Sequence, residues 1–140
     1  MAGDREQLER LAYEARMLEQ QRQIISQRMM QMQESAVQLS VAVDSIKGIG
    51  KSGAKALVPV GAGAMVPAKL EAGNVLVEVG AGAVVEMKPE AAVAVLESRL
   101  KKVSNLQAVA ELDAQKTIQR LQKIDADARE LMKKLNIAPQ

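Results

Sequence analysis

The sequence has no cysteine, histidine, phenylalanine or tryptophan, and Tyr13 is its only aromatic residue. Aromatic side chains supply the largest single burials in most compact cores. Yet 48% of the 140 residues are hydrophobic, almost all of them Ala, Val, Leu, Ile or Met. A chain rich in aliphatic residues but without aromatics favours an elongated or repetitive architecture over a compact globule, and its length suits one domain.

The missing residue types also exclude several kinds of chemistry. Without cysteine there is no disulfide, thiolate nucleophile or zinc ribbon. Without histidine there is no imidazole base, Ser-His-Asp triad or His-ligated metal. The acidic residues are spread along predicted helices and suggest no converging carboxylate pair. The sequence therefore predicts a protein that is not an enzyme, with no catalytic residue, no metal site and no cofactor.

Positive and negative charges are nearly balanced, because 19 basic and 17 acidic side chains leave a formal net charge of +2. This balance gives no strong electrostatic attraction to nucleic acid or to a membrane surface. The polar start, Met-Ala-Gly-Asp-Arg-Glu-Gln, does not resemble a signal peptide, and no apolar run suits a transmembrane helix. We expect a soluble, cytoplasmic protein that binds neither nucleic acid nor membrane.

The N-terminal segment, residues 1–47, has the pattern of a coiled-coil helix. Residues 4–47 contain no Gly or Pro and are dense in strong helix formers. Apolar residues recur in alternating steps of three and four, with one polar exception at Arg22. This first seam consists of Leu8, Leu11, Ala15, Leu18, Arg22, Ile25, Met29, Met32, Ala36, Leu39, Val43 and Ile46. A heptad pattern of this length predicts a helix that requires a partner helix.

The C-terminal segment, residues 89–140, repeats the pattern and ends in a short tail. Pro89 suits the first position of a helix, and Glu90 favours the positive end of the helix dipole. The second seam consists of Val93, Leu96, Leu100, Val103, Gln107, Ala110, Ala114, Thr117, Leu121, Ile124, Ala128, Leu131 and Leu135. Asn136 and Pro139 are expected to end this helix.

Two polar residues interrupt the second seam. Gln107 adjoins Leu106, and Thr117 adjoins Ile118. Because an apolar residue is available one position away in each case, a shift of the seam at these points is an open alternative.

An antiparallel hairpin of the two helices pairs Leu8 with Leu131 and places Arg22 opposite Thr117. A polar layer of this kind fixes the register of a coiled coil at some cost in stability. Two alternatives remain open: the juxtaposition arises by chance, or the Arg22 guanidinium turns out of the seam and buries only its stem.

Between the helices, residues 48–56 are predicted to form a flexible linker and residues 57–88 two β-hairpins. Residues 57–68 align with residues 76–87, nineteen positions on, with eight identical pairs. Each copy has the order strand, Gly-Ala-Gly turn, strand, which is typical of a β-hairpin. We expect the hairpins to join into a four-stranded antiparallel meander that serves as an oligomerisation sheet.

The differences between the two copies indicate which face of this sheet is solvated. Pro59 and Pro67 align with Glu78 and Glu86, and positions that accept Pro or Glu face solvent or an edge. Alternation places six valines on the other face, namely Val58, Val60, Val66, Val77, Val79 and Val85. Because no third element is available to cover them, these valines predict an assembly interface and an obligate oligomer.

Two glycine motifs in the linker are excluded by their context. Gly48, Gly50 and Gly53 match the dinucleotide pattern G-x-G-x-x-G, and Gly50-Lys51-Ser52 resembles part of a phosphate-binding loop. Both motifs require a strand before them and a helix after them. Here a helix precedes the motifs and strands follow, so we interpret the segment as a helix end followed by a linker.

A long helix, a linker, Val-Gly-Ala-Gly units at residues 60–63 and 79–82, and a returning long helix together resemble the alpha class of prefoldin. The beta class of that family has a single hairpin, so two hairpins favour the alpha class. The resemblance implies a mainly α fold, in which two β-hairpins are inserted between the helices of a long antiparallel coiled coil.

The same resemblance implies a function. The chain would be a subunit of an ATP-independent molecular chaperone, or holdase, forming a heterohexamer with beta-class prefoldin subunits. This complex would capture unfolded proteins at its coiled-coil tips and deliver them to a group II chaperonin. The alternative function is a structural homo-oligomer or filament scaffold of alpha-like subunits.

The client-binding role of the family maps to the two chain ends. The residues implied are Leu8, Leu11, Tyr13, Leu131, Met132, Leu135 and Ile137. Apolar groups near a frayed end would bind apolar client segments weakly and without sequence preference. The open alternative is that the leucines of this set simply close the last layers of the seams.

Overall fold

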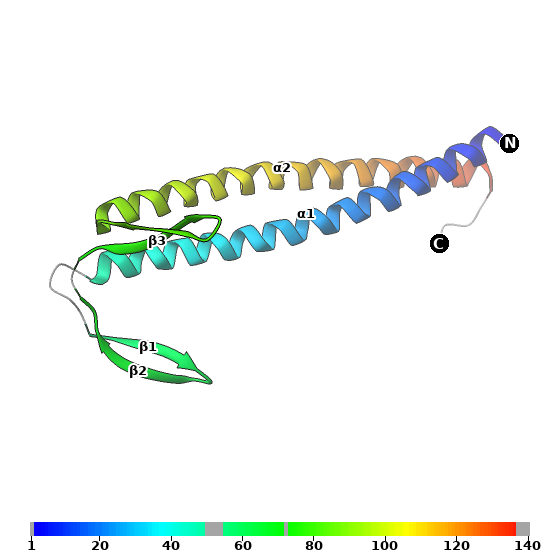
Figure 1. The fold of residues 1–140 in the computed structure, drawn as a ribbon. Coiled ribbons are helices and arrows are strands. Elements are labelled where there is room, and N and C mark those ends of the chain that lie inside the picture. Colours follow the sequence, from blue (N-terminus) through cyan, green and yellow to red (C-terminus); the bar gives the residue numbers. More distant parts are fainter. Residues whose placement is uncertain (1, 50–54, 72, 137–140) are drawn as a thin grey trace. The chain divides into compact units, whose positions relative to one another are not determined.

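A computed structural model describes residues 2–49, 55–71 and 73–136. It contains two long helices, α1 (Ala2–Ile49) and α2 (Pro89–Lys134), which are separated in the sequence by four strands (Figure 1). The strands are β1 (Lys55–Gly61), β2 (Ala64–Lys69), β3 (Val75–Gly80) and β4 (Ala83–Met87). The predicted fold class, mainly α with two β-hairpins inserted between two long helices, is thereby confirmed.

The chain folds as two compact units. The helical unit comprises Met1–Gln33 and Asn105–Gln140, and the hairpin unit comprises Glu34–Ser104. Each unit contains a stretch of both long helices, and the hairpin unit also contains the four strands.

Helix α1 extends further than the sequence pattern indicates. Gly48 lies inside the helix, which ends at Ile49 and not at Lys47. The rest of the predicted linker falls largely on residues 50–54, outside the described residues. Along α1 every apolar member of the first seam is buried or half-buried, whereas Arg22 is exposed. The apolar heptad positions therefore form the buried face of the helix.

Helix α2 has defined ends. The Lys88 carbonyl accepts a hydrogen bond from the Ala92 amide at 2.9 Å, which places Pro89 in the first helical position, where its missing N–H costs nothing. At the other end Asn136 has φ of 58°, and its amide donates to the Lys133 carbonyl at 3.1 Å. A left-handed Asn is a common helix cap. Pro139 lies outside the described residues.

The second seam does not shift at its polar members. Gln107 is half-buried and Thr117 is buried, whereas their apolar neighbours Leu106 and Ile118 are exposed. All the other seam residues are buried or half-buried. The heptad register thus continues through both polar positions.

In the helical unit the helices pack antiparallel around a small apolar core. Its members are Leu11, Ile124 and Leu131, with Leu8, Ala15, Leu18 and Ala128 packed against them. Across the helices Gln107 Nε2 donates to Gln33 Oε1 at 3.1 Å. These contacts follow the antiparallel register that the two seams predict.

In the hairpin unit the same two seams meet at the other end of each helix. Val43 and Leu96 are buried, and Ala92 is fully buried. Lys47 Nζ lies 3.4 Å from Glu97 Oε1 on the flank of this contact.

The strands form two separate antiparallel hairpins, β1–β2 and β3–β4, and not a single sheet. The predicted four-stranded meander is therefore wrong. Two features account for the lack of pairing between β2 and β3. Pro67 has no N–H to donate from β2, and the Glu78 carbonyl on β3 already accepts a hydrogen bond from Arg99 Nη2 at 2.6 Å.

Both hairpins turn through the same two-residue loop. Gly61 pairs with Ala64 across Ala62-Gly63, and Gly80 pairs with Ala83 across Ala81-Gly82. The φ angles are 51° and 79° in the first loop and 51° and 76° in the second. Two central residues with positive φ define a type I′ turn, whose twist matches that of paired strands. The register shifts just before each turn, which marks a β-bulge.

Candidate functional site

The described residues contain no obvious chemical centre. No group of three or more His, Cys, Asp or Glu side chains among them is placed to hold a metal ion. None of the described helices combines the length and hydropathy needed to cross a membrane. The two glycine motifs lie partly in residues 50–54, outside the described residues, and they are preceded by α1 and followed by β1.

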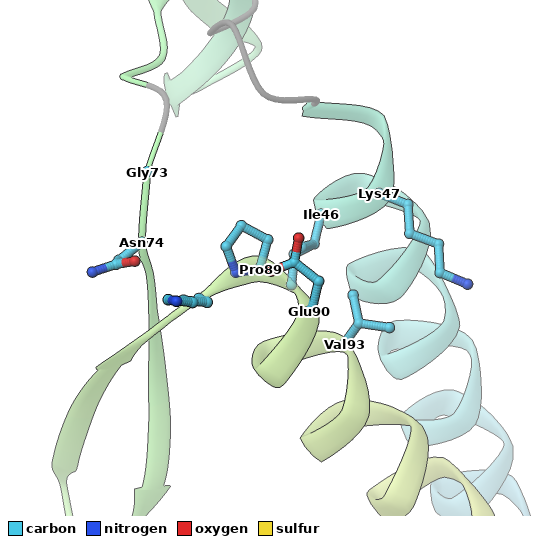
Figure 2. Close-up of a pocket in the computed structure, with 8 residues that line it drawn as sticks. Ile46, Lys47, Gly73, Asn74, Pro89, Glu90 and Val93 are labelled. Carbon is cyan, nitrogen blue, oxygen red and sulfur yellow. The ribbon is translucent and has the colours of Figure 1, made fainter.

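A hollow of about 660 Å³ opens in the hairpin unit (Figure 2). Its lining consists of Ile46, Lys47, Gly73, Asn74, Lys88, Pro89, Glu90 and Val93. In Figure 2, Pro89, Glu90 and Val93 come from the start of α2, and Gly73 and Asn74 come from the segment before β3. The lining holds no hydroxyl, thiol or imidazole group, the usual members of a nucleophile–base pair.

Three of the predicted client-binding residues are packed in the helical unit. Leu11 and Leu131 are members of its core, with 9% and 7% of their surface exposed, and Leu8 packs against them. In this state the three leucines close the last layers of the seams, as the alternative interpretation has it.

The other predicted client-binding residues are more accessible. Tyr13 is 61% exposed, and Met132 and Leu135 are half-buried. Ile137 lies outside the described residues. Tyr13 is therefore the one member of the predicted set that is exposed among the described residues.

Arg22 and Thr117, the predicted polar layer, have separate partners. The Arg22 guanidinium donates to Glu19 Oε1 through both Nε and Nη2. Thr117 is buried, and its Oγ1 donates to the Asp113 carbonyl at 2.9 Å. This arrangement corresponds to the alternative in which Arg22 turns out of the seam.

Charged side chains line the flanks of the helix pair. Arg120 donates to Glu14 across the helices, and this hydrogen bond is the main reason why the pKa of the Glu14 carboxyl lies below its ordinary value. The hydrogen bond from Arg22 lowers the pKa of Glu19 in the same way. Both carboxylates are therefore stabilised in their charged form, next to solvent.

The six valines predicted to form the assembly interface differ in exposure. Val77 is buried, with 6% of its surface exposed, whereas the other five are exposed. The exposed ones are Val58, Val60, Val66, Val79 and Val85. The chain itself therefore covers one of the six valines, Val77, contrary to the expectation that all six lie uncovered.

Sequence reasoning missed a second apolar surface on the hairpins. Four large side chains lie on the face of the Pro and Glu positions and are exposed, namely Leu57, Met65, Leu76 and Val84. They share this face because each pairs directly with one of those Pro or Glu residues, and paired residues project to the same side. The sequence does contain a signal for this second surface, because these four apolar residues alternate with the six valines along the strands.

Apolar residues on the outer sides of the helices were also missed. Besides Tyr13, the exposed ones are Met17, Ile24, Met30, Val37, Val41, Leu106, Val109, Leu112 and Ile118. Leu106, Val109 and Leu112 are three residues apart and so lie near one another on α2. Only their position outside the seam distinguishes them in the sequence.

Comparison with known proteins gives one consistent result. The Prefoldin family model, described as prefoldin subunit, matches residues 11–134. The chain is 33% identical over 73 residues to prefoldin subunit alpha of Methanosphaera stadtmanae, a match covering 51% of this chain and 53% of the relative. It thus spans about half the length of that curated relative. A chain in the cryo-EM structure of filamentous PFD from Methanocaldococcus jannaschii is similar at 24% identity, with a TM-score of 0.48 over 87% of this chain and 98% of that chain.

The region matched by the family model begins in α1, includes both hairpins and ends with the last turn of α2. Prefoldin subunits are non-enzymatic chaperone subunits that form complexes with other prefoldin subunits. The presence of two hairpins and the similarity to a prefoldin subunit alpha both indicate the alpha class of the family. The chain is therefore a member of the prefoldin family, in its alpha class.

Proposed function

We propose that this chain is a subunit of an ATP-independent holdase, which binds unfolded proteins and prevents their aggregation without nucleotide turnover. In this proposal it acts in the cytoplasm, forms a heterohexamer with beta-class prefoldin subunits and passes its clients to a group II chaperonin. The observation that carries the proposal is the thin apolar core of the helical unit.

Only two helices, α1 and α2, contribute side chains to the core of the helical unit. No large side chain among the described residues is fully buried, and even Leu11 and Leu131 keep some exposed surface. Separation of the first turns of α1 from the last turns of α2 therefore exposes apolar surface without disturbing other layers, since stability is lowest at such ends. An unfolded client covers this surface without sequence preference, because apolar burial is non-directional.

Two side chains add apolar surface that needs no separation of the helices. Tyr13 and Met17 are both exposed and lie one turn apart on α1. The tyrosine ring offers a large apolar area with a polar tip, and methionine adapts to irregular partners. Together they suit weak contact with many client sequences.

The hairpins support the proposed assembly. Apolar side chains are exposed on both faces of each hairpin, and isolated two-stranded sheets are marginally stable in water. Contact with further hairpins removes this surface from water. A complex of several subunits is therefore the state in which the hairpins are covered.

Trimming residues 1–12 and 130–140 tests the client-binding ends. The assembled complex that contains the trimmed chain is expected to keep its mass and to lose suppression of the aggregation of a chemically denatured client. Light scattering measures the aggregation and native mass spectrometry the assembly. Unchanged suppression after both trims contradicts the assignment of the ends.

A pair of double variants gives a matched comparison without shortening the chain. Tyr13→Ser with Met17→Ser removes exposed apolar groups near the ends, and Val109→Ser with Leu112→Ser removes exposed groups further along the helical unit. We expect the first pair to weaken suppression several-fold and the second pair to leave it unchanged. Equal loss in both would show that suppression depends on apolar surface anywhere on the helices.

A further inference from the structure

A second hollow in the hairpin unit, the basic groove, is lined by residues of both helices. Its volume is about 510 Å³, and its lining consists of Ser35, Gln38 and Leu39 from α1 and Arg99, Lys102 and Val103 from α2. Leu39 and Val103 are half-buried seam residues, so they form an apolar floor. The lining thus combines apolar surface, a hydroxyl, an amide and two cations, and it contains no carboxylate.

The two cations of the basic groove are neighbours on one helix. Arg99 and Lys102 are three residues apart on α2, a spacing at which side chains share a face about 5–6 Å apart. Arg99 is held in place because its Nη2 donates to the Glu78 carbonyl at 2.6 Å. A guanidinium has five N–H donors, and this is the one hydrogen bond of Arg99 among the described residues. The remaining donors suit a further acceptor.

Positive charge is concentrated around the basic groove without acidic partners. Residues 35–43 of α1 and 98–104 of α2 contain no Asp or Glu, yet the second range contains Arg99, Lys101 and Lys102. None of these three cations forms an ion pair in the part of the chain that the structure describes. The preceding acid on α2, Glu97, is bound to Lys47. Such a local excess of positive charge attracts an anionic group from outside the chain.

We propose that the basic groove binds an acidic segment of a partner protein, with carboxylates next to an aliphatic side chain. One carboxylate accepts hydrogen bonds from Arg99, a second pairs with Lys102, and the aliphatic group covers the floor. Ser35 and Gln38 offer hydrogen bonds to the backbone of the segment. The site contains none of the residues proposed for client binding, so it goes beyond the holdase function and does not depend on it.

The composition of the basic groove favours a peptide over a nucleic acid. Its lining has no aromatic side chain on which a base would stack. Two cations neutralise few phosphates, whereas nucleic-acid affinity depends on many such contacts. The apolar floor instead matches an aliphatic side chain, and a guanidinium binds a carboxylate through parallel N–H groups.

Binding of a labelled peptide of Glu-Glu-Leu repeats to the assembled protein, followed by fluorescence anisotropy, tests this site. A peptide of Gln-Gln-Leu repeats is the control, since it keeps the aliphatic side chains and lacks the charges. We expect only the acidic peptide to bind, with an affinity that falls as salt is added. Equal binding of the two peptides overturns the proposal.

Two neighbouring lysines provide a matched pair of variants. Lys102 lines the basic groove and Lys101 does not, although both are exposed on α2. We expect Lys102→Glu to weaken binding of the acidic peptide about fivefold and Lys101→Glu to leave it nearly unchanged. Equal weakening by the two variants would show attraction to the whole charged surface and overturns the assignment to the groove.

The opposite wall is tested without changing either cation. Gln38→Glu places a carboxylate in the lining, and Ser40→Glu places one at an exposed position of α1 outside it. We expect the first variant to weaken binding of the acidic peptide and the second to have little effect. If Ser40→Glu weakens binding as much as Gln38→Glu does, the peptide does not lie in this groove.

Native mass and aggregation suppression of Lys102→Glu distinguish the other possible occupants. We expect both to be unchanged. A lower native mass would assign the groove to a neighbouring subunit, and a loss of suppression would assign it to clients; either result overturns the proposal. Tighter binding of labelled polyuridylate than of the acidic peptide also overturns it, in favour of a nucleic acid. Lys102-dependent peptide binding in a complex that suppresses no aggregation supports the groove and refutes only the holdase role.

Discussion

Arg120 and Glu14 form a bidentate ion pair between the two helices of the helical unit. Arg120 Nε donates to Glu14 Oε1 at 2.7 Å, and Nη2 donates to Oε2 at 2.9 Å. Two parallel hydrogen bonds from a planar guanidinium fix geometry as well as adding attraction. Because the two residues are distant in sequence, this pair reports directly on the register of the helices.

The ion pair predicts a pH-dependent contribution to stability. The Arg120 hydrogen bond lowers the pKa of Glu14 in the folded state, so this contribution is present above the unfolded-state pKa. It is lost as the pH falls through the lowered folded-state value. We expect Glu14→Gln to lower the Tm of the helical signal at pH 7 and to make no difference in strong acid.

Thermal unfolding followed by circular dichroism at both pH values measures this effect. Glu9→Gln is the control, since it removes a carboxylate of the same helix that forms none of the described ion pairs. A Tm difference of Glu14→Gln that persists unchanged in acid would show that the ion pair is not its source. Added salt should also reduce the difference, because the pair is solvent-exposed.

Arg22 occupies a seam position without filling it. Its guanidinium is bound to Glu19 on the same helix, and about half of its side chain is exposed, at 49%. A leucine at this position would pack in the seam near Thr117 and remove apolar surface from water. We therefore expect Arg22→Leu to raise the Tm by several degrees.

The matched control for Arg22→Leu is Gln23→Leu, which adds the same side chain one position outside the seam. It is expected to leave the Tm unchanged or slightly lower. If both variants stabilise the helix equally, the gain comes from helix propensity and not from the seam.

The helices were the most predictable part of the fold. A heptad pattern directly encodes which side of a helix is buried, and the apolar seam positions are buried or half-buried as expected. At Gln107 and Thr117 the pattern left a shift of the seam open, and the structure shows that the register continues through both. The helix end was less predictable, since Gly48 lies in α1 despite its low helix propensity.

The hairpins were predictable as units, but their arrangement was not. The Gly-Ala-Gly repeat fixes each turn locally, whereas pairing between β2 and β3 depends on groups from elsewhere in the chain. One of these groups is Arg99, which comes from α2 and binds the β3 edge at Glu78. The same applies to Val77, whose burial depends on contacts that alternation along one strand cannot reveal.

The turns of both hairpins contain a strained residue. Ala62 and Ala81 have φ of 51°, a left-handed conformation that disfavours a residue with a Cβ. Asparagine adopts this conformation more readily, and Asn-Gly is the preferred pair for a type I′ turn. We expect Ala81→Asn to stabilise the second hairpin by about 0.5–1 kcal/mol.

Urea denaturation of the assembled protein measures the change at Ala81. The control is Ala83→Asn, which places the same residue in the strand just after the turn, where asparagine is disfavoured. It is expected to destabilise the hairpin. Stabilisation by Ala83→Asn but not by Ala81→Asn would contradict the turn assignment.

The valine face makes a separate prediction about assembly. Val79 is exposed on β3 and belongs to the face that the six valines were predicted to form. An aspartate there would place a charge without a partner in an apolar contact between hairpins, which is costly. We expect Val79→Asp, and likewise Val60→Asp in the first hairpin, to reduce the native mass from oligomer to monomer.

Leu76→Asp is the control on the opposite face, where Glu78 and Glu86 already carry charge, and it should retain the oligomer. If Leu76→Asp disrupts assembly and Val79→Asp does not, the interface lies on the Glu-bearing face instead.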